Sequence, residues 1–413
     1  MRPALVMLCT GLLLLPALAA AQPGAAPPTD TASPAGAVSP APAAAEGQAA
    51  ALVADLRTEF DGLLADPDSY ARTVESECRG FPEGDLFPYL FPAFAYTNMA
   101  ASGLVPRDAA REKVTTLLKL AIPSVVRKVR PPRDDLMRLA SYASHATYLC
   151  QLNAGLAAHA YLGGTDFLPL FDHLSDLLLG ALGKSGGEPL DSFPSYSWPF
   201  DTIPCLFSLA MHDRIRGTLR AGLLATQHFD WIARYGTDPG TGLPASRMSD
   251  DNRRMAEQPR GCDLSLRLLF LGYFDRDAAR GLYKAYVTRF WVERFVAAGF
   301  GEWPDGREKF SDMDSGPILL GIGAGASAMG IGATRVGGDP FRFARLVSQV
   351  VAARAAVRGM VDAAAPGRAS LGGMIPLSAG YVTGFLFGDA VLFFSMTWEP
   401  WPSPATGAAA VHE

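Results

Sequence analysis

Carboxylic acids stand at or just before the start of several apolar stretches of this sequence. These acids are Asp85, Asp134, Asp135, Asp201, Asp263, Asp312 and Asp314. A single aspartate in such a position most often caps a helix, because its side chain accepts backbone N–H groups that the first turn leaves unpaired. Carboxyl groups gathered in one place can also act as general acid and general base, since the one in drier surroundings keeps its proton near neutral pH. Acid/base chemistry is therefore the first hypothesis, and capping is the alternative.

Three of the acids follow loops rich in aromatic residues, Pro and Gly. Residues 192–200 read SFPSYSWPF before Asp201, residues 259–262 read PRGC before Asp263, and residues 299–307 read GFGEWPDGR before Asp312. Flat rings stack on the apolar faces of sugars while acids bind hydroxyl groups, so these loops favour a sugar-binding site. We expect Tyr196, Trp198, Trp303 and Arg260 to contact the substrate there.

The same loops supply the candidate catalytic groups. The pool consists of Asp201, Asp263, Glu302, Asp312 and Asp314. Asp312 and Asp314 are two residues apart, so their side chains can point in different directions ahead of a helix. We expect Asp314 to cap that helix and Asp312 to be the freer group.

A second set of polar side chains lies in the segment SYASHATYLC. Tyr142, His145 and Tyr148 are spaced by three residues, which places them near one face of a helix. Such a face could line the site and supply a proton carrier. The alternative, which we favour, is that His145 is a hydrogen-bonded histidine of the core. The other histidines have no metal-ligand spacing, and no CxxC, HExxH or GxSxG motif occurs, so we expect no metal and no cofactor.

The elements that must position these residues are helices of two kinds. Six segments are apolar nearly all round and begin near residues 85, 135, 201, 263, 314 and 379; between them lie amphipathic segments at about 106–130, 166–183, 216–235, 276–299 and 340–363. A helix that is apolar on every side is buried, whereas one with a single apolar stripe lies outside. The alternation predicts an all-α fold, an (α/α)6 toroid with an inner ring of parallel helices, and residues 49–80 supply the remaining outer helix. In this fold the N-termini of the inner helices meet at one end, which gathers the acids.

The alternating hairpins resemble the six-hairpin toroid superfamily, which includes glycoside hydrolases, polysaccharide lyases and lyases of the linalool dehydratase-isomerase type. Residues 238–243, DPGTGL, are similar to the turn with which such toroids return to the inner ring. The resemblance spans about residues 50–400 and implies an architecture. The motifs SYSWPFDTIPC, RGCDLS, GFGEWP and DMDSGP match no catalytic signature of one member family.

The ends of the chain predict export. Residues 1–21 have a positive start, an apolar core and the small residues Ala19–Ala21, as in a cleaved signal peptide; a retained anchor is the alternative. Residues 22–48 form an Ala/Pro-rich tether that we expect to be disordered, residues 49–402 the toroid, and residues 403–413 a disordered tail. The expected location is the periplasm or the outside of the cell. Cys78, Cys150, Cys205 and Cys262 could form two disulfides or stay buried thiols.

Two apolar segments, 317–334 and 375–398, are long enough to resemble membrane spans. Their many small residues, and Asp389 in the second, favour tightly packed inner helices instead.

The composition limits the partners. With 36 Lys+Arg against 41 Asp+Glu the chain is mildly acidic, which argues against nucleic acid. The leading hypothesis is an exported enzyme that acts on a glycan or a related envelope or extracellular compound. A lyase or isomerase of a small apolar alcohol, using Tyr142, His145, Cys150 and Cys205, is the second, and a non-catalytic binding or scaffold protein of the envelope is the third. The chain could also associate peripherally with the envelope, and its oligomeric state is open.

Overall fold

The structure is a computed structural model that describes residues 41–78, 83–142, 144–294, 297–307, 309–363, 370–371, 375–378 and 380–402. The predicted signal peptide, the tether up to residue 40 and the C-terminal tail lie outside these residues. The first helix begins at Pro42, so residues 42–48, which we expected in the tether, are helical. Ala45, buried in that helix, shows why: the alanines that look featureless in the sequence pack against the domain.

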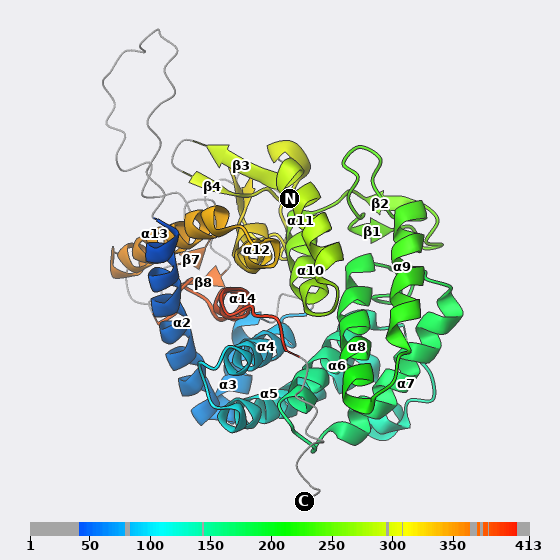
Figure 1. Cartoon of the computed structure of the whole chain (residues 1–413). Coiled ribbons are helices and arrows are strands. Elements are labelled where there is room, and N and C mark those ends of the chain that lie inside the picture. The colour runs from blue at the N-terminus through cyan, green and yellow to red at the C-terminus, as the bar shows by residue number, and fades with distance from the viewer. Residues whose placement is uncertain are drawn as a thin grey trace, which may run out of the picture.

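Six helices form a closed inner ring. They are α4 (Phe87–Ala101), α6 (Ala146–Tyr161), α8 (Thr202–Arg216), α10 (Gly261–Phe274), α12 (Ala324–Gly337) and α14 (Leu386–Met396). Each packs against the next, and α14 packs back against α4, as Figure 1 shows. In α6 every residue except Ala160 is buried, which matches the prediction that these segments are surrounded on all sides.

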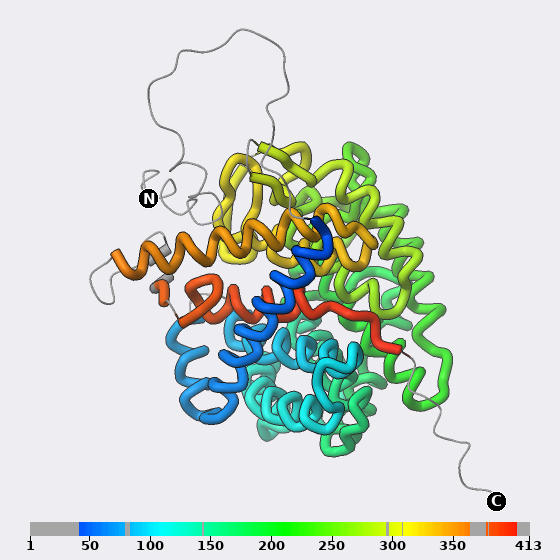
Figure 2. The backbone as a smooth tube through the Cα atoms, turned by 60° about the vertical axis from the view of Figure 1, so that its left-hand side comes forward, coloured from blue at the N-terminus to red at the C-terminus, as the bar shows by residue number. Residues whose placement is uncertain are grey.

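The outer ring surrounds the inner one. It contains α5 (Arg107–Val129), α7 (Leu168–Ser185), α9 (Ala221–Tyr235), α11 (Arg276–Phe290) and α13 (Pro340–Ala363), with α2 (Pro42–Ala65) followed by α3 (Pro67–Cys78). Figure 2 shows α2 crossing α13 and α14, and through these contacts the start of the domain meets its end. Helix α9 buries only Ala221, His228, Trp231 and Ile232, as expected for a surface helix. The fold is thus the predicted (α/α)6 toroid.

The middle of the ring is filled by aromatic side chains. Phe94 of α4 contacts Phe270 of α10 and Phe394 of α14, with ring centroids 5.3 and 5.2 Å apart. At the C-terminal ends of the inner helices Trp401 packs on Tyr273, 4.9 Å between centroids, and its indole N–H donates to Asn98. Side chains therefore fill the centre of the ring and its end where the inner helices finish.

The two ends of the toroid differ in their connections. Turns from inner to outer helices are short, as at Gly217–Arg220 between α8 and α9. The connections from outer to inner helices carry four antiparallel hairpins: β1 (Arg247–Met248) with β2 (Met255–Glu257), β3 (Trp291–Arg294) with β4 (Ala297–Phe300), β5 (Ile318–Leu319) with β6 (Ile322–Gly323), and β7 (Ser370–Leu371) with β8 (Ile375–Pro376). The elaborated loops thus all belong to the end where the inner helices begin.

Three inner helices start later than predicted. Residues 135–145 contain a short 3-10 turn, Leu136–Arg138, instead of the first turns of α6. Residues 314–323 form a turn and the β5–β6 hairpin, because Leu320 and Gly321 both adopt positive φ, as a tight hairpin requires. The third is α14, which begins at Leu386 and not at 379.

The β3–β4 hairpin likewise replaces the end of the predicted outer helix 276–299.

The apolar segments 317–334 and 375–398 do not contain long helices. Helix α12 has 14 residues and α14 has 11. Within the described ranges, no helix is both long and apolar enough to cross a membrane.

Candidate active site

The carboxyl groups predicted to gather do so at the N-terminal end of the inner ring. Asp201 ends the 3-10 turn that leads into α8, Asp263 lies in the first turn of α10, and Asp314 precedes the β5–β6 hairpin before α12. The charges of Asp263 and Asp314 both act on Asp201, so the three groups are electrostatic neighbours although they lie far apart in the sequence.

Asp201 is buried beneath this end. Its carboxylate accepts a 2.6 Å hydrogen bond from the Thr147 hydroxyl of α6 and a further one from Ser192. Burial raises its pKa to about 6; these hydrogen bonds oppose the rise, and the charges of Asp263 and Asp314 add to it. Asp201 therefore changes charge close to neutral pH, but its side chain is enclosed by protein.

Both Asp312 and Asp314 are exposed, but Asp314 is the freer of the two, which reverses the roles we expected for them. Asp314 is exposed to solvent, yet the protein around it limits hydration and raises its pKa to about 6, with Asp312 adding to the rise and Arg260 opposing it. It caps no helix, since α12 begins ten residues later with Gly323 as its N-cap.

Asp312 is the restrained member of the pair. Its Oδ1 lies 2.7 Å from Nη2 of Arg260 and accepts the backbone N–H of Ser315 at 3.0 Å. Burial acts to raise its pKa, but these contacts outweigh burial and lower it. Asp312 is thus an ionised group fixed within its own turn.

Arg260 joins two of the predicted catalytic acids. Its Nε lies 2.6 Å from Oε1 of Glu302, and its Nη2 holds Asp312. Glu302 is fully buried and also accepts the Cys262 backbone N–H at 3.1 Å and the Cys262 thiol at 3.1 Å. Burial raises the pKa of Glu302 to about 7 against the opposing charge of Arg260. This clamp, which we define as Arg260, Glu302 and Asp312, orients the loop and leaves Glu302 out of reach of solvent.

Asp263 is held in a second buried ion pair. One carboxylate oxygen lies 3.1 Å from Nη2 of Arg267, one turn further along α10, and both side chains are almost completely buried. Burial raises the pKa of Asp263, while Arg267 opposes the rise. Its role at this end is electrostatic, through its effect on Asp201.

The structure adds an acid that the sequence analysis missed. Glu83 lies in the turn before α4, and its pKa is raised to about 8 by burial first and then by the charges of Asp314 and Asp201. The sequence pattern could have identified Glu83, because this residue precedes an inner helix as the other acids do. We favoured Asp85, two residues later, but Asp85 pairs with Arg127 of α5 at 3.4 Å.

Of the predicted sugar-stacking residues, Tyr196 and Trp198 are accessible together. Tyr196 is 50% exposed and stacks on Trp198 with centroids 5.9 Å apart, while Phe193 meets Trp198 edge-on at 6.0 Å. The backbone N–H of Asp201 donates to the Trp198 carbonyl, so this aromatic ledge, residues 193–198, is joined directly to the acid.

Trp303 does not have the exposed position we expected. It is 1% exposed, donates its indole N–H to the Phe310 carbonyl, and is covered by the Phe310 ring at 4.8 Å. The guanidinium of Arg260 lies over its ring. Phe310, 48% exposed, presents the accessible ring at this position.

Tyr142, His145 and Tyr148 do not share one helix face, because α6 begins only at Ala146 with His145 as its N-cap residue. The Tyr142 hydroxyl donates to the Asp191 carbonyl at 2.6 Å. Tyr148 is buried and meets Phe193 edge-on at 6.1 Å. We therefore assign the side chains of Tyr142 and Tyr148 to the support of the 191–193 loop.

The four cysteines within the described part of the chain are free and buried. Cys150 and Cys205 are hydrogen-bonded to each other, and burial raises the pKa of Cys150 well above its ordinary value. Among the described residues, no group of three or more His, Cys, Asp or Glu side chains is arranged to hold a metal ion.

Fold and site together define a class: an (α/α)6 toroid with titratable carboxyl groups at the end where its inner helices begin. An α-mannanase of glycoside hydrolase family 76 from Bacteroides thetaiotaomicron is similar in structure, with a TM-score of 0.45 and 10% identity over 80% of this chain and 95% of that chain. A possible member of glycoside hydrolase family 105 from Salmonella enterica serovar Paratyphi A gives a TM-score of 0.42 and 12% identity over 75% of this chain and 82% of that chain. No protein-family model and no curated protein sequence matches the chain.

Proposed function

We propose that the chain is an exported enzyme that acts on a glycan by carboxyl acid/base chemistry at the N-terminal end of its inner ring. The observation that carries the proposal is the group formed by Glu83, Asp201 and Asp314, whose pKa values are all raised and whose charges act on one another. Groups that titrate near neutral pH are suited to proton transfer, and structural ion pairs do not need this property.

The pKa values assign a role to each acid. Glu83, with a pKa of about 8, keeps its proton at pH 7 and is the general acid. Asp314, with a pKa of about 6 and an exposed position, is mostly ionised at pH 7 and is the general base. Asp201 lies buried beside both and sets their electrostatic environment, since a change in its charge alters both pKa values.

The aromatic ledge indicates the chemical class of the substrate. The exposed Tyr196 ring, supported by Trp198, offers a flat apolar surface on the loop that leads to Asp201, at the end of the ring where Asp314 also lies. A sugar ring has both an apolar face and hydroxyl groups at its edge, so it fits such a surface better than an entirely apolar alcohol does.

The experiment that tests this proposal compares hydrolysis of a panel of glycans by the unchanged chain and by Asp314→Asn. Loss of a general base lowers turnover about 10² to 10⁴-fold. Asp108→Asn is the matched control, because Asp108 is an exposed aspartate in the first turn of α5, away from the acids, and should leave turnover unchanged. If Asp314→Asn retains full turnover, or if no glycan is a substrate or ligand, the proposal is wrong.

A further inference from the structure

At the end of the toroid where the inner helices finish, opposite the acids, the short turns carry large apolar side chains that are exposed to solvent. Leu104 between α4 and α5 is 63% exposed, Leu219 between α8 and α9 is 96% exposed, and Phe341 at the start of α13 is 74% exposed. Leu223, one turn into α9, adds a fourth at 66%. Scattered surface leucines are normal, but Leu219 is exposed almost completely.

These apolar tips are spaced regularly around the ring. They follow α4, α8 and α12, which are alternate members of the six inner helices. Among the described residues, the turns after α6 and α10 carry no exposed large apolar side chain. The three tips are spread around one end of the ring and do not form one cluster, so a broad, flat partner can contact all of them at once.

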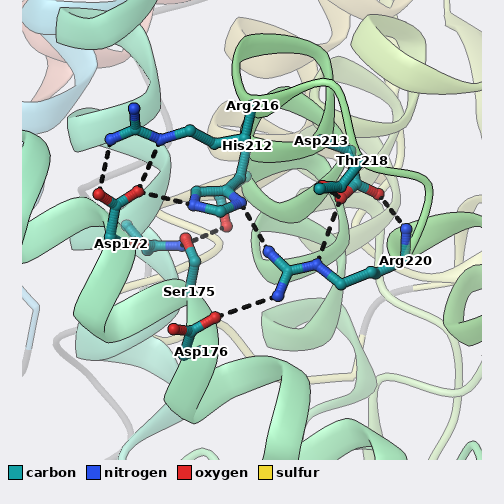
Figure 3. A network of polar contacts seen from close by, with 10 residues as sticks. Asp172, Ser175, Asp176, His212, Asp213, Arg216, Thr218 and Arg220 are labelled. Atoms are coloured by element: carbon teal, nitrogen blue, oxygen red, sulfur yellow. Dashed lines mark hydrogen bonds and ion pairs between the residues drawn. The ribbon is translucent and has the colours of Figure 1, made fainter.

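The residues on both sides of Leu219, Thr218 and Arg220, belong to a network of polar contacts that Figure 3 shows. The Asp213 carboxylate accepts the backbone N–H groups of Arg220 and Ala221 at 2.6 and 2.7 Å, and the Thr218 hydroxyl also donates to it. This network holds Leu219 outward in a fixed conformation, so its exposure does not come from a loose loop.

A histidine supports the same turn. Arg220 donates to Nδ1 of His212 at 3.1 Å, and a guanidinium cannot accept a hydrogen bond, so Nδ1 carries no proton and the Nε2–H group donates to Asp172 at 2.9 Å. Arg216 and Arg220 are neutralised in this network by Asp172 and Asp176.

Two further arginines beside this turn are not neutralised. Arg214 in the last turn of α8 and Arg276 in the first turn of α11 are both exposed, and the positive charge of Arg276 acts on Arg214. Within the ranges that the structure describes, neither guanidinium has a carboxylate at ion-pair distance. An apolar tip such as Leu219, with cations beside it that have no ion-pair partner, complements a bilayer with anionic headgroups, in which apolar side chains enter the interface and arginines meet phosphates.

We propose that this end of the toroid rests on an anionic lipid surface, with Leu104, Leu219 and Phe341 entering the interface and Arg214 and Arg276 facing lipid phosphates. The inner helices are parallel, so the acidic end then faces away from the lipid. The proposal does not depend on the reaction that the acids perform. It names the surface through which the chain would associate peripherally with the envelope.

Hydrogen–deuterium exchange of the full chain tests the proposal, with vesicles of phosphatidylcholine alone and of phosphatidylcholine with phosphatidylglycerol. We expect slower exchange at 102–106, 217–223 and 339–343 with the anionic vesicles, and no change at 193–198. This local readout separates the proposed surface from the apolar segment at residues 4–18, which would bind lipid by itself in an unprocessed chain. Unchanged exchange at the three turns overturns the proposal, and so does equal protection by neutral vesicles.

Variants give a second readout. Leu219→Ser and Phe341→Ser should each lower the affinity for vesicles about tenfold. The transfer of one large apolar side chain from water into the membrane interface contributes a free energy of about that size. Met137→Ser is the matched control, since Met137 is also exposed but lies before α6, at the other end. Arg276→Gln should weaken the preference for anionic vesicles, and Arg214→Gln together with Arg276→Gln should remove it. Protection of the turns that grows with protein concentration without vesicles would instead show that copies of the chain pack through this end.

Discussion

Glu83 and Asp314 carry different numbers of protons near pH 7, and this difference predicts how activity depends on pH. The base must be ionised and the acid protonated, so kcat/KM should rise as pH increases through about 6, the pKa of Asp314, and fall through about 8, the pKa of Glu83. Glu83→Gln should lower the rate and remove the alkaline fall from what remains. A profile that stays flat between pH 5 and 9 would contradict these roles.

The raised pKa of Asp314 also predicts an effect on stability. The folded chain binds the proton of Asp314 more tightly than the unfolded chain does. The stability that this proton contributes is therefore fully present below about pH 4 and is lost as pH rises through about 6. Asp314→Asn should therefore raise the free energy of unfolding at pH 8, by about 1 kcal/mol, since solvent screens an exposed carboxylate. Urea unfolding at pH 5 and pH 8 measures it, and an equal effect at both values would argue against the assignment.

Single residues show how far the site could be predicted from the sequence. The positions of Asp201, Asp263 and Asp314 at one end follow from helix order alone. The exchange of roles between Asp312 and Asp314 depends on Arg260, which lies about fifty residues away, and no local pattern indicates which aspartate it selects. Trp303 was misjudged because a Trp in the sequence Gly-Glu-Trp-Pro has the pattern of a loop residue whether it faces solvent or the core.

At the scale of elements, the clamp of Arg260, Glu302 and Asp312 joins the start of α10 to the loops before α12, and it predicts a measurable loss of stability. Arg260→Lys keeps the charge but cannot hold both carboxylates through separate nitrogen atoms. Because Glu302 would stay buried without its partner, the free energy of unfolding should fall by about 3 kcal/mol. Arg138→Lys, which affects the exposed pair with Asp135, is the control and should change it by less than about 1 kcal/mol. Equal effects of the two substitutions would show that the clamp does not hold the loops.

The inner helices were predictable as elements because burial on all sides leaves a continuous apolar segment. Their starts were less predictable, since residues 314–323 are as apolar as α12 itself and only the positive φ of Leu320 and Gly321 makes them a hairpin. Pro92 shows that a helix can also continue where the sequence suggests an end, because proline usually interrupts a helix but here lies inside the buried helix α4.

For the whole molecule, the N-terminal sequence predicts that the chain is exported and processed. N-terminal sequencing of protein recovered from the producing cells should begin near Gln22, after Ala19–Ala21. An Ala21→Lys substitution should block processing, because the residue before the cleavage site must be small. Ala35→Lys, in the nearby Ala/Pro-rich region but away from the junction, is the control. Recovered protein that still begins at Met1 would mean that the segment is retained.

The closure of the ring determines when this chain can finish folding during synthesis. Helix α4 needs α14 as its neighbour, and Asn98 needs Trp401, 303 residues further along the chain. Until the last residues leave the ribosome, the sides of α4 and α12 that α14 covers remain open, although every other hairpin could already have formed. The contacts that close the ring join residues far apart in the sequence, and the incomplete ring exposes apolar surface for most of translation. We therefore expect a nascent chain stopped before Leu386 to bind chaperones or aggregate, and the completed chain to be released from both.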